Sequence, residues 1–200
     1  MERLRPEQID AAALTLAEAF RDDPLLTLLH PDERKRADIA PWLFGTAIKI
    51  GLPYEQVWAN EDASAVAVWL PPEGANLSVI GLLRAGMAAL PLKVGLRQTI
   101  RFVRAISRLE PFHKAVGGPH WYLASIGTRP ERQRQGLGNA LLEVGTSQAD
   151  AAGLPCYLET LTDEDIAFYS KRGFVVTGQA EAQGLTLSAM VRPAQPRSAD

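Results

Sequence analysis

Hydrophobic residues recur with a helical spacing at the start of the chain and then change their period. Apolar side chains every three or four positions predict an amphipathic helix over residues 9–20, which Pro24 follows. A second apolar segment predicts a helix over residues 39–50. Further along, the period shortens to two. Strands are therefore expected at residues 56–60 and 64–70, joined as a hairpin by an acidic turn.

The middle of the chain returns to a helical period. Helices are predicted at about residues 77–90 and 92–109, separated near Pro91, and together they form a helical insert of about residues 77–109. The second helix carries a stripe of four arginines along one face, namely Arg97, Arg101, Arg104 and Arg108. This stripe fits either a solvated helix face or a rim that attracts an anionic substrate or a coenzyme.

Strands and helices alternate in the last third of the chain. The pattern predicts a buried strand at 121–128, a loop at 129–135, a helix at 136–152, a strand at 155–161, a short helix at 163–172, and strands at 173–177 and 185–191. The polar residues 193–200 are expected to be a disordered tail. The order of elements predicts one α/β (α+β) domain over residues 1–192.

Composition narrows the class of protein. Of the 200 residues, 46% are hydrophobic and 22% are charged, which is typical of a soluble globular domain. The single cysteine, Cys156, excludes an internal disulfide and fits a reducing compartment. The formal net charge of −2 offers no general attraction for nucleic acid or anionic membranes, and no apolar stretch reaches about 18 residues. We therefore expect a cytoplasmic protein, monomer or homodimer, without a nucleic-acid, membrane or metal partner.

The loop after residue 128 has the composition of an anion-binding site. Backbone N–H groups at a helix start can bind a diphosphate, and Gly136 and Gly138 would let the backbone approach it closely. Arg132 and Arg134 would add positive charge there. A glycine pair alone is equally typical of a tight turn that opens a helix. The P-loop pattern G-x-x-x-x-G-K-[ST] and the third glycine of a Rossmann fingerprint are both absent.

Two segments carry a family resemblance. Gln133-x-x-Gly136-x-Gly138 resembles the Q/R-x-x-G-x-G/A acetyl-CoA signature of the GNAT superfamily of N-acetyltransferases. The segment F-Y-S-K-R-G-F at 168–174 resembles the F-Y-x-x-x-G-F segment of that superfamily. Within that superfamily, the chain is similar to puromycin N-acetyltransferases, both in the length of the insert and in four short segments. These segments are V-W at 57–58, A-V-A-V-W at 65–69, H-W-Y-L-A at 120–124 and Y-L-E-T at 157–160.

The resemblance implies the GNAT fold, with a central mixed sheet of about seven strands, splayed fourth and fifth strands, helices on both faces and a very short first strand. It also implies that acetyl-CoA is the acetyl donor. The implied coenzyme-binding residues are Ile126, Gly127 and Thr128 on a strand, and Gln133, Arg134, Gln135, Gly136, Leu137, Gly138 and Asn139 after it. Asp165 stands where such enzymes usually carry an asparagine that touches the coenzyme, so we do not count it as a binding residue.

The implied reaction is transfer of the acetyl group to a primary amine of a small molecule, by direct attack in a ternary complex. Tyr169 would stabilise the thiolate, although a helix tyrosine can also be a packing residue. Glu159 would draw the amine proton through water, or else form a structural ion pair. Trp121 and Tyr122 would line the acceptor pocket or belong to the core.

Other assignments remain open at this stage. His113 and His120 are alternative bases, whereas Cys156 is expected to be an inert core residue. The chain could instead acetylate a protein amine, although the insert would cover the open site that a peptide needs. It could also be a non-catalytic regulatory domain that binds coenzyme A, which the presence of Tyr169 and Glu159 argues against.

Overall fold

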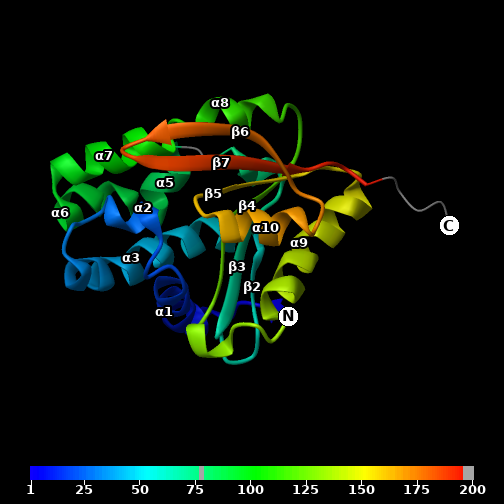
Figure 1. Ribbon diagram of the computed structural model, residues 1–200. Helices are drawn as coiled ribbons and strands as arrows, with labels where there is room; N and C mark the ends of the chain where they lie inside the picture. Colours follow the sequence, from blue (N-terminus) through cyan, green and yellow to red (C-terminus); the bar gives the residue numbers. More distant parts are fainter. Residues whose placement is uncertain (77–78, 196–200) are drawn as a thin grey trace.

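A seven-stranded mixed sheet runs through the computed structural model, which describes residues 1–76 and 79–195 (Figure 1). The strands of this part of the chain are β1 (Glu2–Arg3), β2 (Val57–Ala59), β3 (Ala65–Leu70), β4 (Trp121–Thr128), β5 (Cys156–Thr160), β6 (Val175–Ala182) and β7 (Leu185–Arg192). Their order across the sheet is β1-β2-β3-β4-β5-β7-β6, and β4 and β5 are parallel whereas the other neighbours are antiparallel. The fold class predicted from the sequence is therefore confirmed, including the two-residue first strand.

Helices cover both faces of the sheet (Figure 1). One face carries α1 (Ile9–Ala19), α3 (Glu33–Gly51) and the insert, which extends in the structure beyond its predicted end at residue 109 to Ala115. The insert contains α5 (Val79–Ala85), α6 (Leu90–Val94), α7 (Leu96–Ile106) and α8 (Glu110–Ala115). The other face carries α9 (Leu137–Ala152) and α10 (Asp163–Ser170). The short helices α2 (Pro24–Thr27) and α4 (Pro72–Ala75) complete the set, with 3-10 turns at Pro6–Gln8, Leu52–Tyr54, Met87–Ala89 and Pro130–Arg132.

Each face has its own apolar core. Leu16, Ile48 and Val68 are buried beneath α1 and α3, whereas Trp69 and Leu141 are buried beneath α9. Gly145 allows α9 to lie close to the sheet, because a Cβ at this position would overlap the Trp69 indole. No helix in the described part of the chain is long and apolar enough to cross a membrane.

The helix α3 begins six residues before the predicted start at residue 39. Asp32 is its N-cap, and the carboxylate accepts hydrogen bonds from the backbone N–H groups of Arg34 (2.9 Å) and Lys35 (3.3 Å). The first turn of this helix is polar, so hydrophobic periodicity places the start too late in the chain. The N-cap residue itself can be recognised in the sequence. Pro41 lies inside the same helix and does not end it.

The insert is divided differently from the prediction. The breaks fall at Gly86 (φ +104°) and Gly95 (φ +82°), while Pro91 lies inside α6 near its start, where a proline is tolerated. The helix α8, which opens with Glu110 and Pro111, was not predicted. Residues 77 and 78 of the predicted first helix lie outside the described residues.

The last hairpin is longer than its sequence indicates. The strand predicted at 173–177 is β6, which extends to Ala182 and pairs with β7 along its length. Its C-terminal half alternates polar residues with glycine and alanine, so hydrophobicity does not mark it as a strand. Residues 196–200 of the predicted disordered tail lie outside the described residues.

Candidate active site

A gap opens in the middle of the sheet where β4 and β5 separate. The two strands are paired only over Trp121–Leu123 and Cys156–Leu158, although β4 continues to Thr128. Beyond Leu158, β5 is paired only with β7 in the described sheet. The edge of β4 at residues 124–128 therefore faces the gap, and a chain of amides could bind there as an added strand would. This gap confirms the predicted splaying, and it contains the predicted coenzyme contacts Ile126 and Thr128.

A bulge in β4 determines which face of the sheet each side chain near the gap points to. Leu123 is paired with Trp69 and Ser125 with Val68, so Ala124 is an extra residue without a partner on β3. Such a bulge reverses the alternation of the strand. Ile126 accordingly packs toward α9, while Gly127 faces α1, where a Cβ would overlap Ala19 and Leu16. The close approach of α1 thus requires glycine at position 127.

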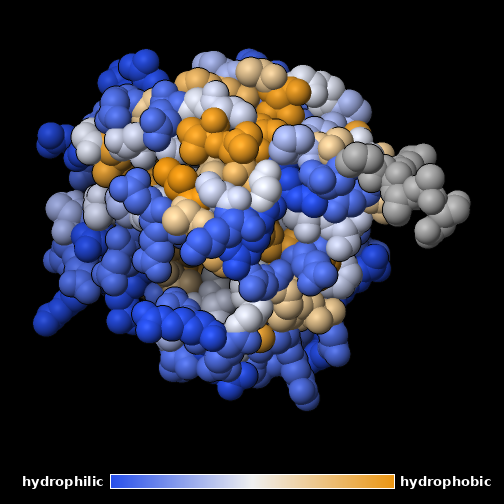
Figure 2. Space-filling view, turned by 45° about the vertical axis from the view of Figure 1, so that its right-hand side comes forward, coloured by the Kyte–Doolittle hydropathy of each residue, from blue (hydrophilic) through white to orange (hydrophobic). Residues whose placement is uncertain are grey.

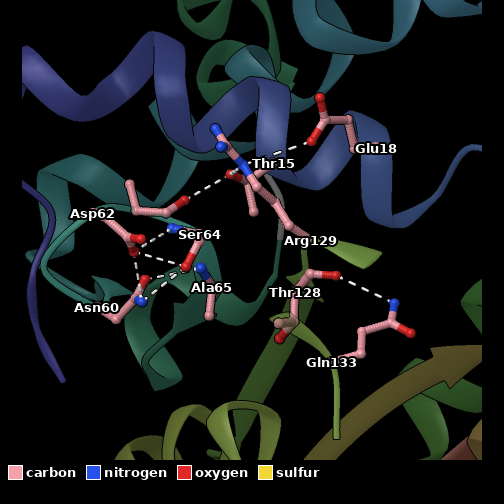
Figure 3. Close-up of polar contacts among 10 residues, drawn as sticks. Thr15, Glu18, Asn60, Asp62, Ser64, Ala65, Thr128, Arg129 and Gln133 are labelled. Carbon is pink, nitrogen blue, oxygen red and sulfur yellow. Dashed lines mark hydrogen bonds and ion pairs between the residues drawn. The ribbon is translucent and has the colours of Figure 1, made fainter. Parts of the chain in front are cut away.

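The base of the coenzyme loop is fixed to α1 by Arg129 (Figure 3). The Arg129 Nε donates to Thr15 Oγ1 (2.9 Å) and lies 3.6 Å from a carboxylate oxygen of Glu18. Thr15 in turn donates to the carbonyl oxygen of Ala63, at the turn of the β2–β3 hairpin (2.6 Å). Gln133 Nε2 donates to the carbonyl oxygen of Thr128 (3.3 Å). Arg129 is therefore a structural residue, and Arg132 and Arg134 are the loop arginines that take part in none of the ion pairs formed by the described residues.

The loop itself adopts the backbone that a bound anion requires. Arg134 (φ +60°) and Gly136 (φ +83°) are both left-handed, and Gly136 is the N-cap of α9. A left-handed arginine is unfavourable, and such conformations concentrate at functional sites. The first N–H groups of α9, beginning with Leu137 and Gly138, have no partner within the helix and can bind a phosphate. Gln133, Arg134 and Gln135 are exposed beside them.

The helix α10 is attached to this helix start through aromatic and arginine contacts. The Phe168 ring lies 3.7 Å from the position of a Cβ on Gly138, and the Arg172 guanidinium lies 3.6 Å from the ring centroid. Arg172 Nε also donates to Asn139 Oδ1 (2.5 Å). The Asn139 side chain, predicted to bind coenzyme, is thus already engaged by Arg172.

Tyr169 lies on the α9 side of the sheet and is buried to 7% exposure. Its ring packs edge-on against Phe168 (5.2 Å) and Phe174 (5.7 Å). Burial, and then the negative charge of Asp165, raises the pKa of the Tyr169 hydroxyl above its usual value. The phenol therefore stays protonated at neutral pH and can donate a hydrogen bond, but it gives up its proton reluctantly.

Glu159 lies on the opposite face, directly after the last residue that β5 pairs with β4. Its Oε2 accepts a 2.7 Å hydrogen bond from the Tyr122 hydroxyl. The Tyr157 hydroxyl lies near the same carboxylate but outside hydrogen-bond geometry. Burial raises the pKa of Glu159, and the two hydroxyls oppose part of that rise. The ion pairs of the described residues do not include Glu159, so the alternative of a structural ion pair finds no support there.

A histidine pair joins the insert to this cluster. His120 Nδ1 lies 3.1 Å from the Gly118 carbonyl oxygen, which can only accept, so this nitrogen carries the proton. His120 Nε2 must then accept from His113 Nε2, 2.8 Å away. The His113 ring stacks on Tyr157 with centroids 4.4 Å apart. Burial, and then His120, lowers the pKa of His113 to about 4, which makes it a weak base.

Trp121 does not join Tyr122 and Glu159. It packs edge-on against Trp69 (6.5 Å) in the core beneath α9, whereas Tyr122 packs on the insert side. Of the two residues predicted to line an acceptor pocket, the structure brings only Tyr122 to Glu159. Cys156 is also in the core beneath α9, and burial raises the pKa of its thiol to about 12.

Two carboxylates influence each other electrostatically in a way that the sequence did not indicate. Asp165 Oδ2 accepts from Thr160 Oγ1 (3.0 Å) and Thr162 Oγ1 (2.7 Å), which fixes the start of α10. Asp23, after α1, accepts from the Leu25 N–H (2.7 Å). Burial raises the pKa of Asp23 to about 6, and the negative charge of Asp165 contributes to the rise. Asp-Pro after a helix signals only a turn, and we found no sequence signal that pairs Asp23 with Asp165.

Comparisons with known proteins agree with this geometry. The profile of the acetyltransferase (GNAT) family matches residues 56–174. An uncharacterized N-acetyltransferase of Schizosaccharomyces pombe is 25% identical over 181 residues, which cover 87% of this chain and 73% of the yeast protein.

Solved structures share the fold. A histone acetyltransferase HPA2 and related acetyltransferase from Corynebacterium glutamicum has a TM-score of 0.67 at 21% identity, over 98% of this chain and 96% of its own. Arylalkylamine N-acetyltransferase 2 from Aedes aegypti has a TM-score of 0.64 at 14% identity, over 97% and 98% of the two chains. Together with the family profile, the splayed strands and the loop before α9 lead to one conclusion: the chain belongs to the acetyltransferase (GNAT) family and is an acetyl-CoA-dependent N-acetyltransferase.

Proposed function

We propose that the acceptor is a small molecule with a primary amine, and that it binds on the insert side of the β4–β5 gap. The observation that carries this proposal is the half-buried Glu159 carboxylate with its Tyr122 hydrogen bond, at the point where β5 leaves β4. The insert packs over this cluster because the His113 ring of α8 stacks on Tyr157 of β5. An enclosed carboxylate suits a small amine better than an extended peptide. The fold neighbours do not decide between them, since one is named for histones and another for arylalkylamines.

In this proposal the residues on the two faces of the sheet have different roles in the reaction. Acetyl-CoA would supply a thioester carbonyl as the electrophile. Glu159 accepts the amine proton, directly or through water, and a backbone N–H near Ile126 donates to the developing oxyanion. Tyr169 donates a hydrogen bond to the thiolate. Because burial raises the pKa of Tyr169 and a free thiol has a pKa of about 8.5, we expect hydrogen bonding to dominate over full proton transfer.

The coenzyme would be held by the backbone of Ile126, Gly127 and Thr128 and by the loop from Gln133 to Asn139. Acetyl-CoA at about 100 times its dissociation constant should stabilise the folded protein by roughly 2.7 kcal/mol. Gly136→Val should abolish that shift in a thermal melt while the protein stays folded, because position 136 has open space around it but requires a left-handed backbone (φ +83°). An unchanged shift in Gly136→Val would remove this loop from the binding site.

A release assay for the coenzyme thiol, run over a panel of small amines and unstructured peptides, tests the acceptor. We expect turnover with some small amines and none with peptides. Aminonucleosides, puromycin among them, belong in the panel because of the likeness in residues 57–69, 120–124 and 157–160. Turnover of peptides alone would replace this proposal with protein acetylation.

A further inference from the structure

The insert carries positive charge that the net charge of the chain conceals. Between Glu73 and Glu110 the sequence has no acidic residue and six basic ones, Arg84, Lys93, Arg97, Arg101, Arg104 and Arg108. The three arginines of α7 and Arg108, which follows the helix, take part in none of the ion pairs formed by the described residues. Their stripe is thus an uncompensated positive field on a protein with a formal net charge of −2.

The same helix exposes apolar side chains beside the arginines. Phe102 and Ala105 face the core, whereas Leu96 is 67% exposed and Ile100 is 42% exposed. A helix that buries one face normally presents polar residues on the others. Figure 2 shows one face of the molecule, which is mostly hydrophilic with hydrophobic residues gathered in a limited area. Exposed aliphatic residues next to free arginines are typical of an interaction surface.

A groove follows the arginine side of α7. Its first part, with a volume of about 840 Å³, is lined by Leu96, Arg97, Ile100, Arg101, Arg104 and Gln183. Its second part, about 550 Å³, shares Arg104 and Gln183 and continues to Arg108 beside Glu181. Arg101 Nε donates to Gln183 Oε1 (3.3 Å), so the turn between β6 and β7 forms the opposite wall. Glu181 is the one acidic lining residue, and it accepts from Thr186 Oγ1 (2.7 Å).

We infer that this groove binds an acidic polypeptide segment with interspersed aliphatic side chains. The groove extends along α7 from Leu96 to Ile106, which corresponds to roughly 15 Å at 1.5 Å per residue, and continues to Arg108 in the turn after the helix. An extended peptide rises about 3.3 Å per residue, so five or six residues would span it. Carboxylates of such a segment would pair with Arg97, Arg101 and Arg104, and its aliphatic residues would cover Leu96 and Ile100.

Shape and charge favour this occupant over two others. Arg97 and Arg104 are exposed, but a flat anionic membrane would contact only the rim of the groove, whereas a segment lying along α7 would contact both walls. A second copy of the chain, bound through the same surface, would place its own arginines opposite these and be repelled. The inference concerns a surface outside the proposed acceptor site and does not depend on which amine is acetylated.

Fluorescence anisotropy with two labelled ten-residue peptides tests the inference. One peptide alternates glutamate and leucine, and the other alternates lysine and leucine. The parent protein should bind the glutamate peptide at least tenfold more tightly, and affinity should fall with added salt. The double variant Arg97→Glu/Arg104→Glu should weaken that binding by roughly tenfold or more and should prefer the lysine peptide.

Arg84→Glu is the matched control, because Arg84 is an exposed arginine of the insert outside the lining residues. It should bind the glutamate peptide as the parent does. Equal binding of both peptides by the parent, or equal loss in the control, would overturn the inference. Binding to anionic vesicles but not to the glutamate peptide would overturn it in favour of a membrane surface.

Discussion

The two sides of the β4–β5 gap are built in different ways. On the side that faces α9, the backbone of one continuous segment predominates, in which β4, the loop with left-handed Arg134 and Gly136, and the start of α9 follow one another; α10 adds Tyr169. The side that faces the insert combines Tyr122, Tyr157 and Glu159 from two strands with His113 from α8. Local backbone geometry makes the first side, and side chains distant in sequence make the second.

This difference corresponds to the two roles that we propose for the two sides, coenzyme binding on the α9 side and acceptor binding on the insert side. A diphosphate is bound by backbone N–H groups, so the coenzyme side needs glycine and a helix start rather than particular side chains. An acceptor is selected by side chains. If the two sides are independent, each substitution should affect either coenzyme binding or acceptor use, but not both. The following experiments test this expectation.

The largest effect is expected from Tyr169→Phe, which keeps the packing against Phe168 and Phe174 and removes only the hydroxyl. The transition state loses a hydrogen bond to the thiolate, so kcat should fall by roughly 10²–10⁴. Steady-state kinetics and calorimetry should show acetyl-CoA affinity and Tm nearly unchanged. Turnover within a fewfold of the parent would make Tyr169 a packing residue.

Glu159→Gln should lower kcat by about 100-fold, because the amide cannot accept the amine proton. Burial raises the folded pKa of Glu159, and the ionised form is the base, so parent activity should fall as pH drops through that raised pKa, above the usual 4.5. The variant should lose this acidic limb. Its Tm at pH 7.5 should equal or exceed that of the parent, because an ionised group with a raised folded pKa costs stability. An unchanged pH profile would exclude Glu159 as the base.

Gly178→Ala tests the acceptor side through the insert alone. A Cβ on Gly178 of β6 would overlap the Phe112 ring of α8, so the helix must shift. We expect a loss of about 1–3 kcal/mol in the free energy of unfolding and a severalfold higher KM for the amine, with unchanged acetyl-CoA binding. The Phe112→Leu background should reduce the effect in a double-mutant cycle. A parallel loss of coenzyme affinity would show that the two sides are coupled.

Asp23→Asn, next to the start of α2, should have the smallest effect. The folded pKa of Asp23 is raised from 3.8 to about 6, so the stability associated with its protonated form is present below pH 3.8 and lost as pH rises through 6. Asparagine can still accept from the Leu25 N–H and carries no charge. Denaturant unfolding should therefore show a gain of about 1–2 kcal/mol at pH 7.5 and little difference near pH 4. An equal gain at both pH values would point to a cause other than the charge.

The sequence by itself determined the elements whose signals are local. Alternating apolar residues marked the β2–β3 hairpin, and the segment from β4 through α9 was visible as a strand, a glycine-containing loop and a helix. These predictions succeeded because backbone conformation, periodicity and helix starts depend on residues close together in the chain. The seven-stranded sheet then followed from the family resemblance rather than from periodicity.

Tertiary structure decided what depends on partners far along the chain. The bulge at Ala124 reverses the alternation of β4, so that Ile126 packs toward α9 and Gly127 faces α1. Arg129 turns to α1, and Asn139 is engaged by Arg172, although both belong to the segment that the sequence marks as anion-binding. Hydrogen bonds and burial between distant segments set these side-chain directions and the pKa values that accompany them. Spacing along the chain carries no record of such contacts, because they exist only once the sheet and both layers of helices have packed.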